Sequence, residues 1–310
     1  MTLSISNSSQ ALVANICAFF LWSAVTLIFN ALSGIDNLQV LALRILFSML
    51  FCGVLLALTP QVRRSVVQLK GQEWRLLLLS SLLIASNWYL VIFAISLNQL
   101  SSASLGYFLA PILSVALLKW RQKEKVTAVE FIAIGLCLLG AAVVIQARYL
   151  NSLPWIGITI AATFAWYSVL KKTRPIAPLV TLSVETGFAA IPALLFIALG
   201  LLGLGDSGLG ITGHSYDFTA GQWGLMLLLG AVTTLPILLY IGSVVHLSAT
   251  TVGLLQYLNP TLMLLVAIGI FGEKVSDSVL GGFLILWSGI LVYAICSVYG
   301  VVNTITARRS

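Results

Sequence analysis

The sequence predicts an all-α integral membrane protein whose ten transmembrane helices form two inverted five-helix repeats. Three observations lead to this fold class. Only 8% of the 310 residues are charged and 60% are hydrophobic, whereas a soluble chain carries roughly 25% charged residues. Ten apolar stretches have about the length of a membrane-spanning helix, ~20 residues. The second half of the chain also repeats the pattern of the first.

The ten stretches are expected to be helices because backbone groups in hydrocarbon must find partners within their own segment. Leucine runs such as residues 76–79 do not alternate with polar residues, as the strands of an outer-membrane barrel would. The expected spans are residues 10–30, 38–58, 74–97, 101–119, 126–146, 153–170, 178–200, 221–243, 248–271 and 277–299.

Lysine and arginine predict the orientation. With the N-terminus in the cytoplasm, the inner connectors and the C-terminal tail hold 13 basic residues, whereas the outer connectors hold only Arg148 and Lys274. Because cytoplasmic loops are enriched in basic residues, both termini are expected to be cytoplasmic. The same distribution explains the net charge of +7 without a nucleic-acid partner.

A shift of 149 residues sets Pro111 on Pro260 and Gly140 on Gly289, and a shift of 144 sets Trp22 on Trp166. We therefore expect two repeats, residues 10–146 and 153–299. Each holds five helices, and because five is odd the second repeat must cross the membrane in the opposite sense. Inverted repeats of this kind are typical of secondary transporters that alternate around one central site. The two glycines are expected to allow close helix packing.

Several motifs in residues 11–299 together resemble the RarD group of EamA-type transporters, in the drug/metabolite transporter superfamily. The resemblance implies a ten-helix permease of the bacterial inner membrane that exports small metabolites or drugs. Two departures bear on selectivity: Leu43 stands where the family pattern has a histidine before Arg44, and Ala110 replaces the asparagine before Pro111. The motifs are Asn87–Trp88, Ser104–Phe108 with Pro111, Ser152–Trp155, Val184–Thr186, Gly253–Thr261 and Phe271–Glu273.

Uncharged polar and aromatic residues within the spans are the candidate substrate-binding residues. Polar groups are costly against lipid, so they are expected to face a cavity, or to hydrogen-bond another helix as packing contacts; both readings stay open. The two tryptophans are candidates to stack on a ring-bearing or cationic solute, or to serve only in packing. The candidates are Asn87, Tyr107, Gln256, Tyr257, Asn259, Trp22 and Trp166.

Arg44 and Glu185 are the ionisable residues expected well inside spans, at matching places in the two repeats. A charge at the bilayer centre costs ~2.5–3.5 kcal/mol even on the mildest scale, which marks such residues as functional candidates. A direct ion pair and two separate positions are both compatible with their spacing. Glu185 is a candidate proton-coupling carboxylate, with orientation of its helix as the alternative.

Among the prolines within expected spans, Pro111, Pro236 and Pro260 are the candidate helix-breaking residues. Proline in a helix frees a backbone carbonyl and bends the helix, and broken helices line the sites of many carriers. The alternative is a tolerated kink.

We expect no cofactor and no metal ion, because the one loose group of potential ligands, Asp206, His214 and Asp217, lies in a glycine-rich connector. The four cysteines lie in apolar stretches and are expected to serve in packing. No set of residues suggests an enzyme, and no GxxxxGK[ST] motif suggests ATP-driven pumping. The predicted function is a secondary-active transporter that carries a small-molecule substrate across a lipid bilayer. A channel or membrane scaffold is the alternative, an integral-membrane enzyme a more distant one, and a homodimer is left open.

Overall fold

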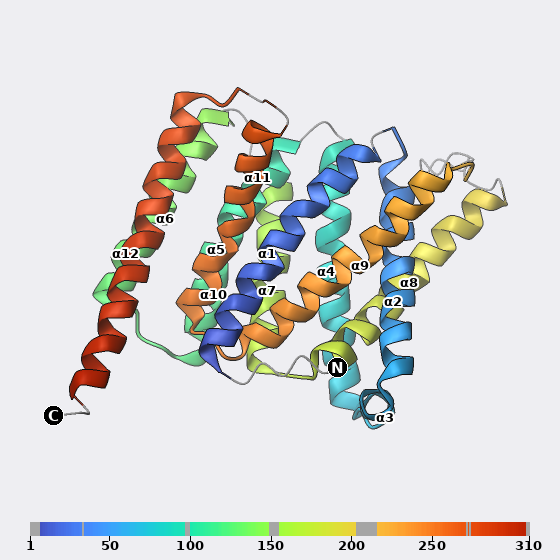
Figure 1. The fold of residues 1–310 in the computed structure, drawn as a ribbon, viewed down its shortest axis with the longest axis horizontal. Helices are drawn as coiled ribbons and strands as arrows, with labels where there is room; N and C mark the ends of the chain where they lie inside the picture. The colour runs from blue at the N-terminus through green and yellow to red at the C-terminus, as the bar shows by residue number, and fades with distance from the viewer. Residues whose placement is uncertain are drawn as a thin grey trace. The chain divides into compact units, whose positions relative to one another are not determined.

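Every regular element that the structure describes is a helix, as the sequence predicts. The structure is a computed structural model, and it describes residues 7–32, 34–96, 100–148, 155–202, 216–270, 272 and 274–307. The helices in Figure 1 are α1 (Ser8–Ala31), α2 (Asn37–Leu58), α3 (Pro60–Val67), α4 (Gly71–Ser96), α5 (Leu100–Gln122), α6 (Ala128–Arg148), α7 (Trp155–Thr173), α8 (Pro178–Leu201), α9 (Ala220–Val244), α10 (Ala249–Gln256), α11 (Leu258–Gly269) and α12 (Asp277–Ala307).

Several helices begin where side chains can satisfy the free N–H groups of a first turn. The Asp36 carboxylate accepts hydrogen bonds from the first residues of α2 at 3.0 Å. Thr219 and Gln222 form a reciprocal capping box at the start of α9. Thr127 and Glu130 do the same at α6, where the Thr127 N–H donates to the carboxylate at 2.8 Å. Polar residues between the apolar runs therefore fix where these three helices start.

Eight segments of the described residues are long and apolar enough to cross a membrane. One of them, Ala249–Gly269, joins α10 and α11. The expected spans 101–119 and 153–170 correspond to α5 and α7, which are not among the eight. The structure thus supports a multi-pass helical membrane protein, and the count of ten remains a prediction.

The chain divides into two compact units. Unit 1 comprises residues 1–99 and 166–247. Within it α1 packs along α9, α2 packs against α8 and α9, and α4 packs against α8. The approach of α2 to α9 is close at Gly230, where an added Cβ would lie 2.5 Å from the Phe47 Cβ. The Ser48 hydroxyl donates to the Gly230 carbonyl there at 3.2 Å.

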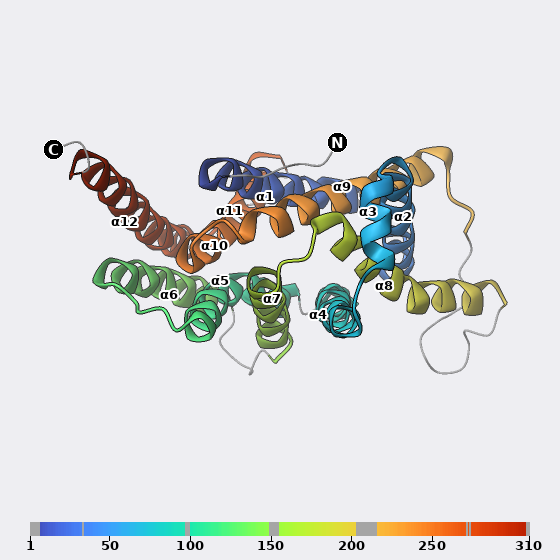
Figure 2. The same ribbon diagram turned by 90° about the horizontal axis from the view of Figure 1, so that it is seen from below.

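Unit 2 comprises residues 100–165 and 248–310, so α7 passes from this unit into unit 1. Its main packing is between α6 and α12, which run side by side in Figures 1 and 2. An added Cβ at Gly140 would lie 2.5 Å from the Gly282 carbonyl oxygen, and one at Gly289 would lie 2.7 Å from the Ala133 oxygen. Both glycines allow close packing, so that expectation is confirmed.

Two contacts in unit 2 join residues that the 149-residue shift makes equivalent. The Cys137 thiol lies 3.6 Å from the Leu286 carbonyl oxygen, and these residues are 149 apart. The Tyr257 hydroxyl donates to the Phe108 carbonyl at 3.3 Å, again across 149 residues. Equivalent residues meet in this way when two related segments pack around a local two-fold axis.

Candidate functional site

A buried ion pair occupies the interior of unit 1. The Lys171 ammonium, on the last turn of α7, forms a salt bridge with the Glu185 carboxylate of α8. Their side chains are only 4% and 1% exposed. Burying two charges carries a desolvation cost that good geometry and further hydrogen bonds must offset.

Two hydroxyl groups, of Ser80 and Tyr167, supply those further hydrogen bonds, and a third, of Ser81, bonds the backbone beside them. Ser80 of α4 donates to the Glu185 carboxylate, and Lys171 donates to the Ser80 oxygen at 2.9 Å. The Tyr167 hydroxyl donates to the other carboxylate oxygen of Glu185 at 3.1 Å, and the Ser81 hydroxyl donates to the Glu185 backbone carbonyl at 2.8 Å. We call Lys171, Glu185, Ser80 and Tyr167 the buried charge cluster.

Residue spacing along α7 and α4 explains how the cluster forms. Tyr167 and Lys171 are four residues apart and therefore share one face of α7. The Lys171 nitrogen lies 4.7 Å from the centre of the Tyr167 ring, within cation–π range. The cluster holds a positive and a negative charge together and joins them to two hydroxyl groups.

Arg44, the other charge expected inside a span, lies in a different environment. Its guanidinium lies 4.3 Å from the centre of the Trp88 ring of α4 and 5.9 Å from that of Phe29 of α1. The cationic partner of Glu185 is Lys171. Both aromatic faces lie within cation–π range of the Arg44 charge and help to stabilise it.

An aromatic group lies next to this cluster. Trp22 of α1 packs against Phe19 and against Tyr240 of α9, with ring centroids 5.3 and 5.6 Å apart. The Tyr240 hydroxyl lies 2.6 Å from the Ser168 hydroxyl oxygen of α7. Because Ser168 directly follows Tyr167, the last turns of α7 connect the aromatic group to the buried charge cluster.

The other two candidates in unit 1 differ in burial. Asn87 is buried on α4, seven residues after Ser80 and therefore on the same face of that helix. Trp166 is 41% exposed, whereas Trp22 is half-buried. The two tryptophans that the sequence aligns thus have different surroundings.

The remaining candidates belong to unit 2 and gather near the α10–α11 break. The Ser114 hydroxyl of α5 donates to the Gln256 side-chain oxygen at 3.1 Å. Tyr257 is buried in an apolar cluster that includes Phe108 and Phe283. Tyr107 and Asn259 are half-buried.

Only one of the three predicted helix-breaking prolines coincides with a break. Pro260 follows the point where α10 ends at Gln256 and α11 begins at Leu258. Proline lacks an N–H and its ring clashes with the carbonyl four residues earlier, which here belongs to Gln256. Pro111 and Pro236 lie inside continuous helices α5 and α9.

A second buried ion pair lies in unit 2. The Lys119 ammonium of α5 lies 2.9 Å from the Glu130 carboxylate of α6, and the Thr250 hydroxyl of α10 donates to the same carboxylate. Lys119 also donates to the Lys125 carbonyl at 3.1 Å. The pair fixes the ends of three helices, two from the first predicted repeat and one from the second.

Sequence reasoning missed Lys171 and Lys119, because both were assigned to cytoplasmic connectors. Glu185 itself carried the signal, since a carboxylate inside a span needs a partner, and Lys171 is a basic residue at the end of the preceding helix. The described residues contain no group of three metal-ligating side chains. Asp206 and His214 lie outside the residues that the structure describes.

Comparisons with known proteins give the family. Residues 9–146 match the EamA-like transporter family. An uncharacterized transporter of Pseudomonas aeruginosa is 33% identical over 291 residues, which cover 93% of this chain and 94% of the relative. An uncharacterized transporter of Vibrio cholerae is 31% identical over 300 residues, 95% of each chain. Protein RarD of Escherichia coli is 27% identical over 292 residues, 94% of this chain and 95% of that protein.

The fold is also known from experiment. A crystal structure of a protein with 18% identical residues matches with a TM-score of 0.75, covering 94% of this chain and 99% of that one. At this identity the match concerns the fold alone. The chain is a membrane transporter that belongs to the EamA-like family, as a RarD-type member of the drug/metabolite transporter superfamily.

Proposed function

We propose that this transporter is a secondary-active carrier that moves a small metabolite or drug by alternating access. In this proposal, ten spans form the inverted repeats 10–146 and 153–299. The protein lies in the bacterial inner membrane with both termini in the cytoplasm. Two oppositely inserted repeats can exchange conformations, which gives inward-open and outward-open states of similar energy.

The contacts between repeat-equivalent residues carry this proposal. Cys137 meets Leu286, and Phe108 meets Tyr257, each pair being 149 residues apart. The unit boundaries agree with the repeat, because unit 1 stops at Gln99 and again at Leu247, 148 residues later. Each unit therefore contains matching segments of both proposed repeats, as expected if the two repeats change conformation together.

The charge distribution supports the proposed orientation after one adjustment. Lys119 and Lys171 are buried in ion pairs and so do not act as free cytoplasmic charges. Without them, eleven basic residues remain on the proposed inner side, against two on the outer side. Basic residues therefore still favour the cytoplasmic side, and this distribution still requires an even number of membrane crossings.

The buried charge cluster is proposed to couple transport to protons. Protonation of Glu185 would leave the Lys171 charge without its counter-ion in a desolvated site, so the two protonation states favour different local arrangements. The seven predicted substrate-binding residues remain candidates for contact with the solute. The helix break between α10 and α11 favours three of these candidates over the others, because it lies beside Gln256, Tyr257 and Asn259.

Counterflow in proteoliposomes tests the carrier mechanism. Purified protein is first screened by thermal shift against amino acids, nucleobases and aromatic drugs, because a ligand that binds the folded form raises its melting temperature. A labelled ligand is then offered to vesicles that are preloaded with excess unlabelled ligand. A carrier accumulates label transiently by exchange. Unsaturable flux without counterflow would identify a channel, and a chemically altered solute would identify an enzyme.

The proton-coupling role is tested separately by Glu185→Gln, with Asp277→Asn as its control. Asp277 is an exposed acid in the first turn of α12, so its substitution removes a carboxylate outside the buried charge cluster. Uptake by Glu185→Gln is expected to lose its dependence on an imposed pH gradient while counterflow persists. Uptake that still responds fully to the pH gradient would remove Glu185 from the mechanism.

A further inference from the structure

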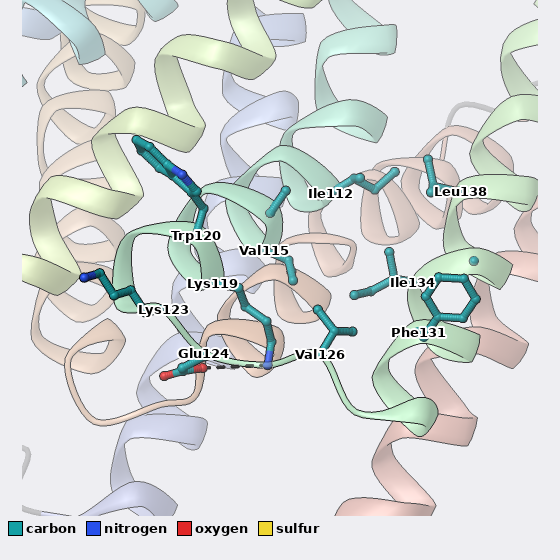
Figure 3. A pocket seen from close by; sticks show the side chains of 12 residues that line it. Ile112, Val115, Lys119, Trp120, Lys123, Glu124, Val126, Phe131, Ile134 and Leu138 are labelled. Carbon is teal, nitrogen blue, oxygen red and sulfur yellow. Dashed lines mark ion pairs between the residues drawn. The ribbon is translucent and has the colours of Figure 1, made fainter.

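We infer that the groove between α5 and α6 is a binding site for one anionic phospholipid, a partner that the transport function does not require. The groove has a volume of about 830 Å³ and is lined by α5, α6 and the connector between them, all within unit 2 (Figure 3). Its apolar walls come from Ile112, Val115, Phe131, Ile134 and Leu138. In a bilayer, the molecules available to fill an open apolar groove are lipids.

The side chains that line the groove change along its length from apolar to charged. From Ile112 to Lys119 α5 rises ~10 Å at 1.5 Å per residue, and the lining changes over that distance from aliphatic side chains to charged ones. Figure 3 shows the aliphatic groups between the helices and Lys119 and Glu124 at the connector. A phospholipid has the same gradation from acyl chain to headgroup.

Two exposed aromatic side chains place this change of polarity at a membrane surface. Trp120 is 68% exposed at the charged end of the groove, and Phe131 is 73% exposed at the start of α6. Tryptophan is enriched at the headgroup level, where its ring is half in hydrocarbon and half in water. The charged end therefore lies where a lipid phosphate would lie.

Lys123 is the basic group proposed to meet the phosphate. Lys119 is committed to Glu130 and Glu124, with nitrogen–oxygen distances of 2.9 and 3.7 Å. The Lys123 ammonium, by contrast, makes no hydrogen bond or ion pair with any residue that the structure describes. Lys123 also has a φ of 55°, a left-handed conformation that is costly for a residue with a side chain.

The charge balance favours an anionic occupant. The connector and the adjoining helix ends carry Arg121, Lys123 and Lys125 besides Lys119, against the two acids Glu124 and Glu130. Basic pockets beside transmembrane helices bind anionic headgroups, and each basic residue near an anionic surface contributes ~1 kcal/mol. One such residue corresponds to roughly a five-fold change in affinity.

The test measures lipid binding to purified, delipidated protein in mild detergent. The probes are dioleoylphosphatidylglycerol, dioleoylphosphatidylcholine and glycerol phosphate, and the readouts are bound lipid by native mass spectrometry and the melting temperature. Phosphatidylglycerol is expected to bind and to raise the melting temperature more than the other two. Equal binding of phosphatidylcholine would overturn the role of charge, and an equal shift with glycerol phosphate would identify a free-anion site instead.

Two variants address the two ends of the groove, and each is compared with its own lipid-free state. Lys123→Asn removes the charge but tolerates the left-handed backbone, with Lys70→Asn as its control. Gly135→Leu fills the groove, since nothing lies within 4 Å of a Cβ added at Gly135. Its control is Gly53→Leu, where the space around an added Cβ is equally open.

Lys123→Asn is expected to weaken phosphatidylglycerol binding by roughly five-fold, and Gly135→Leu to reduce the bound lipid by one molecule. The two control variants are expected to bind as the unsubstituted protein does. Unchanged binding in either groove variant would overturn the proposed site.

Discussion

Lys171 and Glu185 are predicted to stabilise the fold only as a pair. Removing one partner of a buried ion pair leaves an uncompensated charge and costs ~3–5 kcal/mol. Glu185→Leu should lie in this range, because the Lys171 ammonium would keep only the Ser80 oxygen at 2.9 Å and the Tyr167 ring at 4.7 Å. Lys171→Met should lie at the lower end, because the carboxylate keeps two hydroxyl donors.

The double variant Lys171→Met/Glu185→Leu should recover most of that loss. It removes both charges and replaces them with apolar groups of similar size, an exchange that is often nearly neutral. The Ser80 hydroxyl keeps its bond to the Leu77 carbonyl at 3.1 Å, and losing the hydrogen bonds of Ser80 and Tyr167 to the carboxylate costs ~1–2 kcal/mol together. The coupling energy, the double-variant loss minus the two single losses, is therefore expected to exceed ~3 kcal/mol in magnitude.

Reversible unfolding in mixed micelles, followed by far-ultraviolet circular dichroism, measures these free energies. A neutral pair in the same unit is the matched control: the Asn15 amide donates to the Ser243 hydroxyl at 2.7 Å, and both residues are buried. Alanine substitutions in that pair should couple by only ~0.6 kcal/mol, the average for hydrogen bonds between membrane helices. If the Lys171 and Glu185 losses add within ~0.5 kcal/mol, as independent sites do, the ion pair does not hold α7 to α8.

Three further outcomes follow from backbone geometry, each measured by the same unfolding assay. Gly140→Ala should lower the free energy of unfolding by ~1–3 kcal/mol through overpacking, because the added methyl would lie 2.5 Å from a backbone oxygen. Gly135→Ala, on the same helix, has open space around the added methyl and should raise the free energy of unfolding by ~0.5–1 kcal/mol. Lys123→Gly should raise the free energy of unfolding by ~1 kcal/mol, because glycine adopts the φ of 55° without strain. Lys123→Ala should leave the free energy of unfolding unchanged. Pro260→Ala should join α10 to α11 and raise the free energy of unfolding. If the break serves as a hinge, the variant should also slow counterflow. Equal counterflow rates would show that the break is not a hinge.

The buried charge cluster shows where sequence reasoning reaches its limit. Glu185 was identified because a carboxylate stands out inside an apolar run, but its partner was not. Lys171 adjoins Lys172 at the end of a span, where lysines commonly extend to the membrane surface. Lys172 does cap a helix end, donating to the Val244 carbonyl at 3.2 Å, whereas Lys171 turns inward. Only the placement of α4 and α8 around α7 distinguishes the two neighbours.

The prolines show a similar limit for backbone structure. Pro111, Pro236 and Pro260 all lie in apolar surroundings, so the sequence gives no reason to separate them. Of these three described positions, the helix breaks near Pro260 alone, at Tyr257, whose N–H group donates to the Leu254 carbonyl three residues back at 3.1 Å. This tighter turn leaves the Gln256 carbonyl outside the regular helical ladder, as the ring of Pro260 requires. The position of a proline fixes which carbonyl is released, but whether the helix breaks there depends on the tertiary packing of that helix, which sequence patterns do not report.

Glycine positions were easier to predict, and the reason lies in how helices associate in lipid. Lipid tails are as apolar as leucine side chains, so burial of apolar surface cannot drive one membrane helix onto another. Close contact requires small residues, and these are visible in a sequence. Gly140 and Gly289 are matched by the 149-residue shift, and each contacts the other helix of the α6–α12 pair, Gly140 near Leu286 and Gly289 near Cys137. Because the same shift also matches Cys137 with Leu286, α6 and α12 contact each other through matched positions. A substitution at either glycine should therefore disturb the same interface.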